Sequence, residues 1–210
     1  MAAYFRIILE ERRKRPQDDL ITALVQASDA DGNGLDEIEL IGFCMLLLVA
    51  GNETTTNLIS SAVLCLESCP DVYGEMRRDR ALIPGAIEET LRFCSPVQVM
   101  ERRVKADIDW NGYRMQAGQK VYTYIGSANH DERVFADPER FDVRRSPNPH
   151  LAFGHGIHFC LGATLARLEA SVALSVLADR LERLERADDE PLERLDSSMM
   201  FGLKRLRLNG

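Results

Sequence analysis

A single cysteine lies among glycines in the segment Phe153-Gly154-His155-Gly156-Ile157-His158-Phe159-Cys160-Leu161-Gly162. The apolar pattern that follows predicts a long helix over residues 161–184. Because the dipole and unpaired N–H groups of a helix N-terminus stabilise negative charge, we expect Cys160 to be held as a thiolate. Gly156 and Gly162 would let the backbone turn sharply and approach a flat ligand, against which Phe153 could pack. This arrangement suits a thiolate ligand to the iron of a haem; a buried cysteine in a helix-capping turn is the alternative.

Composition places the chain among ordinary globular proteins. Its 210 residues are 45% hydrophobic and 28% charged, and the net charge of −7 argues against a nucleic-acid partner, which needs a basic face. The longest uncharged run, residues 40–52, is too short to span a membrane, and no signal peptide is expected at the start. Five scattered cysteines, an odd number, fit a reducing cytoplasm better than a disulfide framework.

Apolar periodicity predicts a mainly α-helical chain with small β-sheets, an α+β fold. We expect helices over residues 2–14, 18–26, 37–68, 70–78, 84–93 and 161–184, and strands over residues 97–104, 108–110, 113–115 and 121–125. Asp36 followed by Glu39 predicts a capping box for the third helix. The last helix carries an apolar stripe formed by Leu165, Leu168, Val172, Val176 and Leu181. The tail, residues 195–208, is expected to form a closing hairpin.

The third helix has a polar hexapeptide, Ala50-Gly51-Asn52-Glu53-Thr54-Thr55, in its apolar middle. Buried polar groups need partners, so an acid and hydroxyls are costly there. Gly51 weakens the helix locally, and a threonine hydroxyl can bond back to a carbonyl one turn earlier. The resulting groove could hold a small ligand and pass protons to it through Glu53 and Thr54. A threonine-rich kink with a surface glutamate is the alternative.

Two further motifs are less specific evidence of function. Glu89 and Arg92 form a helical i, i+3 acid–base pair, which is common on solvated surfaces. The loop Asp29-Ala30-Asp31-Gly32-Asn33-Gly34 matches the first six positions of an EF-hand calcium loop. Position twelve of that loop is Leu40 rather than a bidentate glutamate, so a polar turn between helices is favoured over a calcium site.

The cysteine segment resembles the ligand loop of the cytochrome P450 family, because it matches Phe-x-x-Gly-x-x-x-Cys-x-Gly at every fixed position. The hexapeptide resembles the oxygen-activation motif of the family's central helix. The resemblance implies that Cys160 binds the haem iron in a loop that includes Phe153, Gly156, His158 and Gly162. Thr54 would hydrogen-bond dioxygen, and Glu53 would gate proton delivery. Gly51 would lie against the cofactor.

Other roles follow from the same resemblance. Glu89 and Arg92 would form a buried structural network with Arg140 of the segment Pro138-Glu139-Arg140-Phe141. Arg102 and His158 would pair with the haem carboxylates, with a surface arginine as the alternative for Arg102. Substrate contacts would come from residues 97–100 and from Leu46, Val49, Ala50, Met199 and Met200. Core packing explains these substrate candidates equally well.

The resemblance implies one haem-thiolate region over residues 1–210, equivalent to the C-terminal half of the family's fold. Residues 1–35 would be lead-in helices, 36–69 the central oxygen-binding helix, 84–152 the acid–arginine helix, strands and meander, and 153–210 the ligand loop, last helix and hairpin. The N-terminal half would then be a missing partner.

The implied function is a cytoplasmic monooxygenase that hydroxylates a small apolar organic substrate. It would use b-type haem, O2 and electrons that come from NAD(P)H through a ferredoxin or similar donor. Alternatives are a truncated, non-catalytic haem-binding fragment and, more remotely, a calcium-binding protein.

Overall fold

The computed structural model describes residues 1–31 and 34–209. The chain divides into two compact units, Met1–Glu53 and Thr54–Gly210. The long helix α3 (Glu37–Glu67) belongs to both, because the boundary falls within it. The loop weighed above as a calcium site lies partly outside the described residues.

The first unit consists of α1 (Ala2–Lys14), α2 (Leu20–Asp31) and the first turns of α3. Asp36 and Glu39 form the predicted capping box: the Glu39 N–H donates to Asp36 Oδ1 at 2.8 Å, and the Asp36 N–H donates to Glu39 Oε2 at 2.9 Å. The small core of this unit contains Phe5, Leu9, Val25, Leu40, Ile41 and Cys44.

Part of the apolar middle of α3 is exposed in this chain, although a helix that is hydrophobic all round is usually buried. Leu46, Leu48 and Val49 all present their side chains to solvent. By length and composition α3 could cross a membrane, and its most apolar 18-residue stretch is 22% buried. The central helix of a soluble protein passes the same test, so the absence of a membrane span stays a prediction.

Helices form the core of the second unit, which contains α4 (Pro70–Arg78), α5 (Ile83–Phe93), α6 (Ile125–Ala128), α7 (Ala163–Arg180) and the short 3-10 turns η1 (Arg80–Leu82) and η2 (Gly156–His158). Apolar residues from the later turns of α3 and from α4, α5 and α7 pack together in one cluster. Gly85 of α5 lies against the meander, the irregular segment of residues 129–152, where a Cβ atom would clash with the carbonyl oxygen of Val143. The absence of a side chain at residue 85 therefore permits this close approach.

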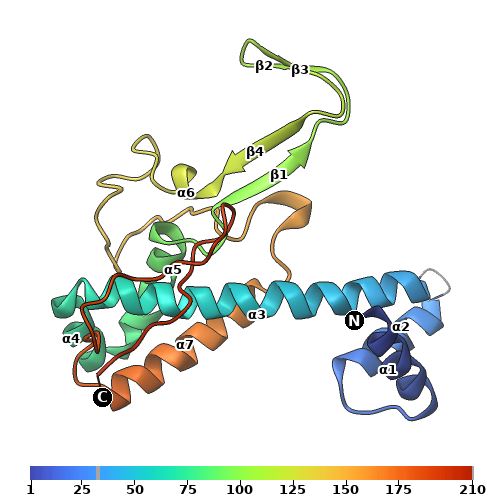
Figure 1. Ribbon diagram of the computed structural model, residues 1–210, viewed down its shortest axis with the longest axis horizontal. Coiled ribbons are helices and arrows are strands. Elements are labelled where there is room, and N and C mark those ends of the chain that lie inside the picture. Colours follow the sequence, from blue (N-terminus) through green and yellow to red (C-terminus); the bar gives the residue numbers. More distant parts are fainter. Residues whose placement is uncertain (32–33, 210) are drawn as a thin grey trace. The chain divides into compact units, whose positions relative to one another are not determined.

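The strands form two small antiparallel sheets. Strands β1 (Val99–Arg103) and β4 (Lys120–Tyr124) pair with each other, and β2 (Ile108–Trp110) pairs with β3 (Tyr113–Met115). The β2–β3 hairpin extends beyond the end of the β1–β4 pair (Figure 1). These sheets, with the helices, make the predicted α+β fold.

Helix α7 buries the face opposite to most of the apolar stripe seen in its sequence. Its buried residues are mostly small, namely Ala163, Ala170, Leu174 and Ala178. Most of the predicted stripe is exposed, and only Leu181 packs against the core. Both faces of the helix are apolar, so periodicity could not distinguish them, and alanines allow the closer packing between α7 and α5.

Leu174→Ala should lower the free energy of unfolding by about 2–5 kcal/mol, because Leu174 is fully buried and truncation leaves a cavity. Leu168→Ala on the same helix should change it by less than about 0.5 kcal/mol, because Leu168 is 60% exposed. Urea denaturation followed by circular dichroism measures both effects. Equal losses would contradict the burial of the alanine face.

Candidate functional site

Backbone hydrogen bonds fold the segment around Cys160 into a closed loop. The Cys160 N–H donates to the carbonyl of Phe153 at 2.9 Å, and the Gly154 N–H donates to the carbonyl of Leu151 at 2.9 Å. Gly154 and Gly156 have φ values of +73° and +75°, a region that favours glycine. Gly162 has a φ of −84°, which any residue can adopt, so the turn there, closed by a hydrogen bond from the Ala163 N–H to the Cys160 carbonyl at 3.3 Å, does not require glycine. A Cβ atom there would lie 4.0 Å from Cys160 Sγ.

The half-buried Cys160 lies in a loop with an apolar, exposed rim. Ile157 is 98% exposed and Leu161 is 75% exposed, and Phe159 is exposed beside them. Among the described residues, no group of three or more His, Cys, Asp or Glu side chains could hold a metal ion. A haem brings its own ring nitrogens, can take a single cysteine thiolate as its axial ligand from the protein and has apolar faces. The donor and its apolar surroundings therefore fit a haem.

Glu89 and Arg92 of α5 form a fully buried ion pair. Arg92 donates to both carboxylate oxygens of Glu89, at 2.9 Å from Nε and 2.8 Å from Nη2. Its Nη1 also donates to the carbonyls of Asn129 at 2.9 Å and Pro138 at 2.8 Å. The pairing predicted from the i, i+3 spacing is present, and it lies in the core rather than on the surface.

The meander supplies a second arginine to this pair, and that residue is Arg145. Its Nε lies 3.2 Å from each oxygen of Glu89. Arg140, the predicted partner, contributes its backbone carbonyl instead, which accepts from Arg92 at 3.1 Å and from Arg145 at 3.0 Å. The Arg140 side chain is exposed. The prediction is therefore corrected: the guanidinium comes from Arg145, five residues further along the chain.

A second group of charged residues, missed in the sequence, lies next to the cysteine loop. Arg167 of α7 donates to both oxygens of Glu88, at 2.6 and 2.9 Å, and His150 Nε2 lies 3.0 Å from the same carboxylate. The Arg167 guanidinium carbon lies 4.5 Å from the centre of the Phe153 ring. No motif joins these three residues, and the only sequence signal is a second glutamate beside Glu89.

Arg102 and His158, the predicted partners of the haem carboxylates, are exposed, and neither forms an ion pair with another described residue. Arg102 lies on β1, where its Nη1 donates to the carbonyl of the neighbouring Glu101 at 3.0 Å. His158 lies in the exposed turn η2. Both side chains are accessible to a ligand, and their assignment to haem carboxylates stays a prediction.

Two candidate substrate segments lie side by side in the second unit. The Met199 carbonyl accepts from the N–H groups of Gln98 at 2.8 Å and Val99 at 3.3 Å, and Met200 pairs with Val97 in a β-bridge. An open hollow of about 360 Å³ is lined in part by Val99 and Met200.

The oxygen-motif residues lie along an unbroken stretch of α3. Thr54 belongs to the second unit, as does Cys160. Glu53, Gly51 and the substrate candidates Leu46, Val49 and Ala50 belong to the first. A Cβ atom added at Gly51 would meet nothing within 4 Å, so this glycine is not required by packing within the chain.

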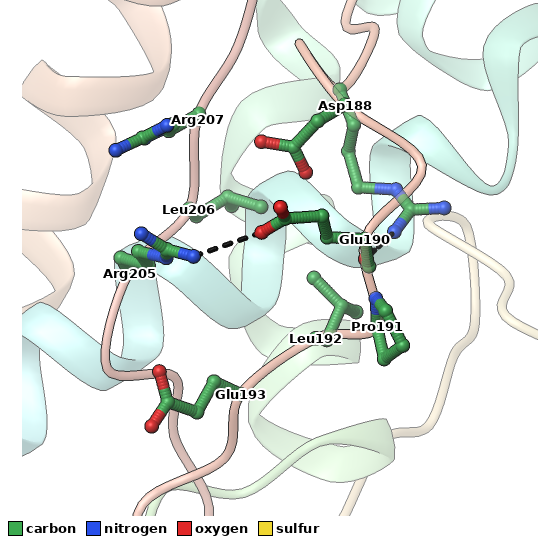
Figure 2. Close-up of a pocket in the computed structure, with 9 residues that line it drawn as sticks. Asp188, Glu190, Pro191, Leu192, Glu193, Arg205, Leu206 and Arg207 are labelled. Carbon is green, nitrogen blue, oxygen red and sulfur yellow. Dashed lines mark hydrogen bonds and ion pairs between the residues drawn. The ribbon is translucent and has the colours of Figure 1, made fainter.

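A hollow near the C-terminus is lined mainly by charged side chains (Figure 2). In it Arg205 and Glu190 form an ion pair at 2.9 Å. Its volume of about 20 Å³ suffices for a water molecule but not for an organic ligand. None of its lining residues is a candidate of the cysteine site.

Comparison with known proteins identifies the family. Residues 1–208 match the sequence profile described as Cytochrome P450. The chain belongs to the cytochrome P450 family. It is 49% identical over 207 residues to "Cytochrome P450 109" of Bacillus spizizenii, a match that covers 98% of the chain and 51% of that protein.

Solved P450 structures share the fold. CYP109E1 from Bacillus megaterium in complex with testosterone matches with a TM-score of 0.92 and 46% identity, over 98% of this chain and 57% of that one. P450BioI in complex with hexadec-9Z-enoic acid ligated acyl carrier protein matches with a TM-score of 0.92 and 41% identity, over 100% and 53%. This P450 chain therefore spans about half the length of the curated relatives it matches, 52% and 51% for two of them.

Arg145→Met should lower the free energy of unfolding of this P450 chain by roughly 3 kcal/mol, because it leaves the buried Glu89 carboxylate short of a charged partner. Arg140→Met should cost less than about 0.5 kcal/mol, since the carbonyl that it contributes is retained. Urea denaturation distinguishes the two variants. A larger loss for Arg140→Met would restore the original assignment.

Proposed function

We propose that this chain binds b-type haem through the Cys160 thiolate and carries the oxygen-activating part of a P450 monooxygenase. The fit of the Cys160 loop carries this proposal: the backbone N–H of Cys160 donates to the Phe153 carbonyl, and this bond holds a soft sulfur donor within an apolar, accessible rim. Bound haem would supply the redox chemistry, with thiolate donation favouring cleavage of the O–O bond. Arg102 and His158 would bind its carboxylates as charged hydrogen-bond donors.

Thr54 and Glu53 would handle oxygen and protons in this proposal. A hydroxyl can donate to dioxygen and accept a proton in exchange, and an adjacent carboxylate can relay protons from solvent. Glu53 is exposed and Thr54 is half-buried, as such a relay requires. The net reaction would insert one oxygen atom into a C–H bond and reduce the other to water, using two electrons and two protons.

The substrate would be a small apolar organic molecule, and the electrons would come from NAD(P)H through a ferredoxin or similar donor. Two relatives support this substrate class, since their structures contain testosterone and a hexadecenoyl chain on its carrier protein. Candidate contacts are residues 97–100, Met199 and Met200, with Leu46, Val49 and Ala50 from α3. We propose a cytoplasmic location because the five cysteines are free thiols, as is usual in a reducing compartment.

Further polypeptide would be needed to complete the enzyme. Relatives are about twice as long, and this chain leaves large apolar side chains exposed on α7, among them Leu165, Leu168 and Val172. Exposed apolar patches of this kind mark surfaces that bind another chain or segment. A non-catalytic haem-binding fragment is therefore the second candidate function, and it shares the haem site with the first.

Haem reconstitution followed by a carbon monoxide difference spectrum tests the ligand. We expect a strongly red-shifted Soret band for the reduced chain, because thiolate ligation produces it. Cys160→Ser should abolish that band, whereas Cys69→Ser, which alters another partly exposed thiol, should retain it. Survival of the band in Cys160→Ser, or its absence from the unaltered chain, would refute the assignment.

Thr54→Ala should divert electrons from product to hydrogen peroxide while leaving haem binding unchanged, because the hydroxyl that delivers the proton is lost. Thr54→Ser keeps the hydroxyl and serves as the matched control. The measurement is peroxide formed per NAD(P)H oxidised in the haem-loaded chain with a ferredoxin, its reductase and an apolar substrate. An unchanged ratio in Thr54→Ala would remove Thr54 from the mechanism, and the absence of any product would favour the second candidate function.

A further inference from the structure

We propose that Glu88, His150 and Arg167 form a positioning network that holds Phe153 and the Cys160 loop in their haem-binding arrangement before haem arrives. The inference rests on the proposed haem site. It concerns three residues that take no direct part in binding, and it assigns them a role distinct from that of the buried Glu89 network.

Glu88 is the centre of the network because it joins three parts of the second unit. It lies on α5, accepts two hydrogen bonds from Arg167 of α7 and is in contact with His150, which precedes the cysteine loop. Burial raises the pKa of Glu88, but the hydrogen bonds from Arg167 and His150 and the positive charge of Arg167 outweigh burial and lower this pKa to about 2. The carboxylate thus stays ionised, and such bidentate pairs fix geometry as well as adding energy.

His150 transmits this fixed geometry to the loop. The Ala152 N–H donates to its Nδ1 at 3.3 Å, so Nδ1 is the acceptor and the ring proton lies on Nε2, which donates to Glu88. The imidazole is almost fully buried, with 4% of its side chain exposed. One neutral ring therefore connects the α5 carboxylate to the backbone of the residue before Phe153.

Arg167 contacts the loop directly, through the side chain of Phe153. Its guanidinium lies over the Phe153 ring at 4.5 Å, a cation–π contact, while Glu88 holds it in place. The pKa of Arg167 is raised chiefly by its hydrogen bond to Glu88 and also by the negative charge of that carboxylate. Because the Phe153 carbonyl accepts from the Cys160 N–H, fixing Phe153 also fixes the cysteine.

Amide hydrogen exchange of the haem-free chain tests the network directly. Glu88→Gln keeps the shape of the side chain but removes the charge, and Arg167→Met keeps its stem. Each variant should speed exchange at residues 150–162 roughly ten- to a hundredfold, the expected effect of losing one charge-assisted hydrogen bond. Arg144→Met breaks a bidentate pair with Glu75 elsewhere in the same unit and should leave that segment unchanged.

The haem-loaded chain provides the second measurement. Arg167→Met should speed transfer of haem to apomyoglobin and lower the reduction potential of the iron, because the positive charge next to Phe153 of the cysteine loop is lost. Arg167→Lys keeps the charge but loses the bidentate pair with Glu88. Its reduction potential should therefore match that of the unaltered chain, while its amide exchange at residues 150–162 stays fast. If Arg167 contributed to stability alone, Arg167→Met would leave the reduction potential of the folded, haem-loaded protein unchanged. That result would overturn the proposal.

The two proposals fail in different ways. If the unaltered chain does not bind haem through Cys160, the haem function fails, whereas faster exchange in Glu88→Gln would still establish the network. If haem binds but neither variant differs from Arg144→Met in exchange, the network is refuted and the haem function stands.

Discussion

A buried carboxylate that must be fully paired organises the second unit. Glu89 has no contact with water, so its charge is tolerable only because Arg92, Arg145, Asn148 and the N–H of Asp142 all donate to it. Three of these four donors come from the meander. Leaving this buried carboxylate unpaired would cost free energy. The meander, which lacks repeating backbone hydrogen bonds, is therefore held in the one conformation against α5 that supplies these donors.

The Glu89 network is connected to the cysteine loop through Asn129, the residue after α6. Asn129 is fully buried; its carbonyl accepts from Arg92, and its Oδ1 accepts from the N–H of Leu151 at 2.8 Å. Leu151 in turn accepts from Gly154 within the loop. The buried Glu89 network thus fixes the start of the cysteine loop, while Glu88 and Arg167 fix the position of Phe153. The two adjacent glutamates of α5 therefore hold different parts of the same loop.

Local signals in the sequence predicted the structure well, and contacts between distant segments were the source of the errors. The capping box at Asp36 and Glu39 and the pair Glu89–Arg92 each depend on residues three apart, so spacing was sufficient. Arg140 and Arg145 could not be separated in this way, because both lie in a meander without periodicity. Glu88 meets His150 and Arg167 across separations of 62 and 79 residues, and no short motif records such contacts.

The exposed apolar surface links haem binding to the stability of the chain. Ile157, Phe159 and Leu161 surround Cys160 but bury little area in the haem-free chain, so they contribute little to its folding. A ligand that binds only the folded state stabilises it in proportion to the logarithm of its concentration over its dissociation constant. Haem covering this rim would therefore add stability that the haem-free chain does not have. Without haem, the loop keeps its conformation while its rim is exposed, because the charged contacts of Glu88 and Arg167 hold it rather than burial of the rim.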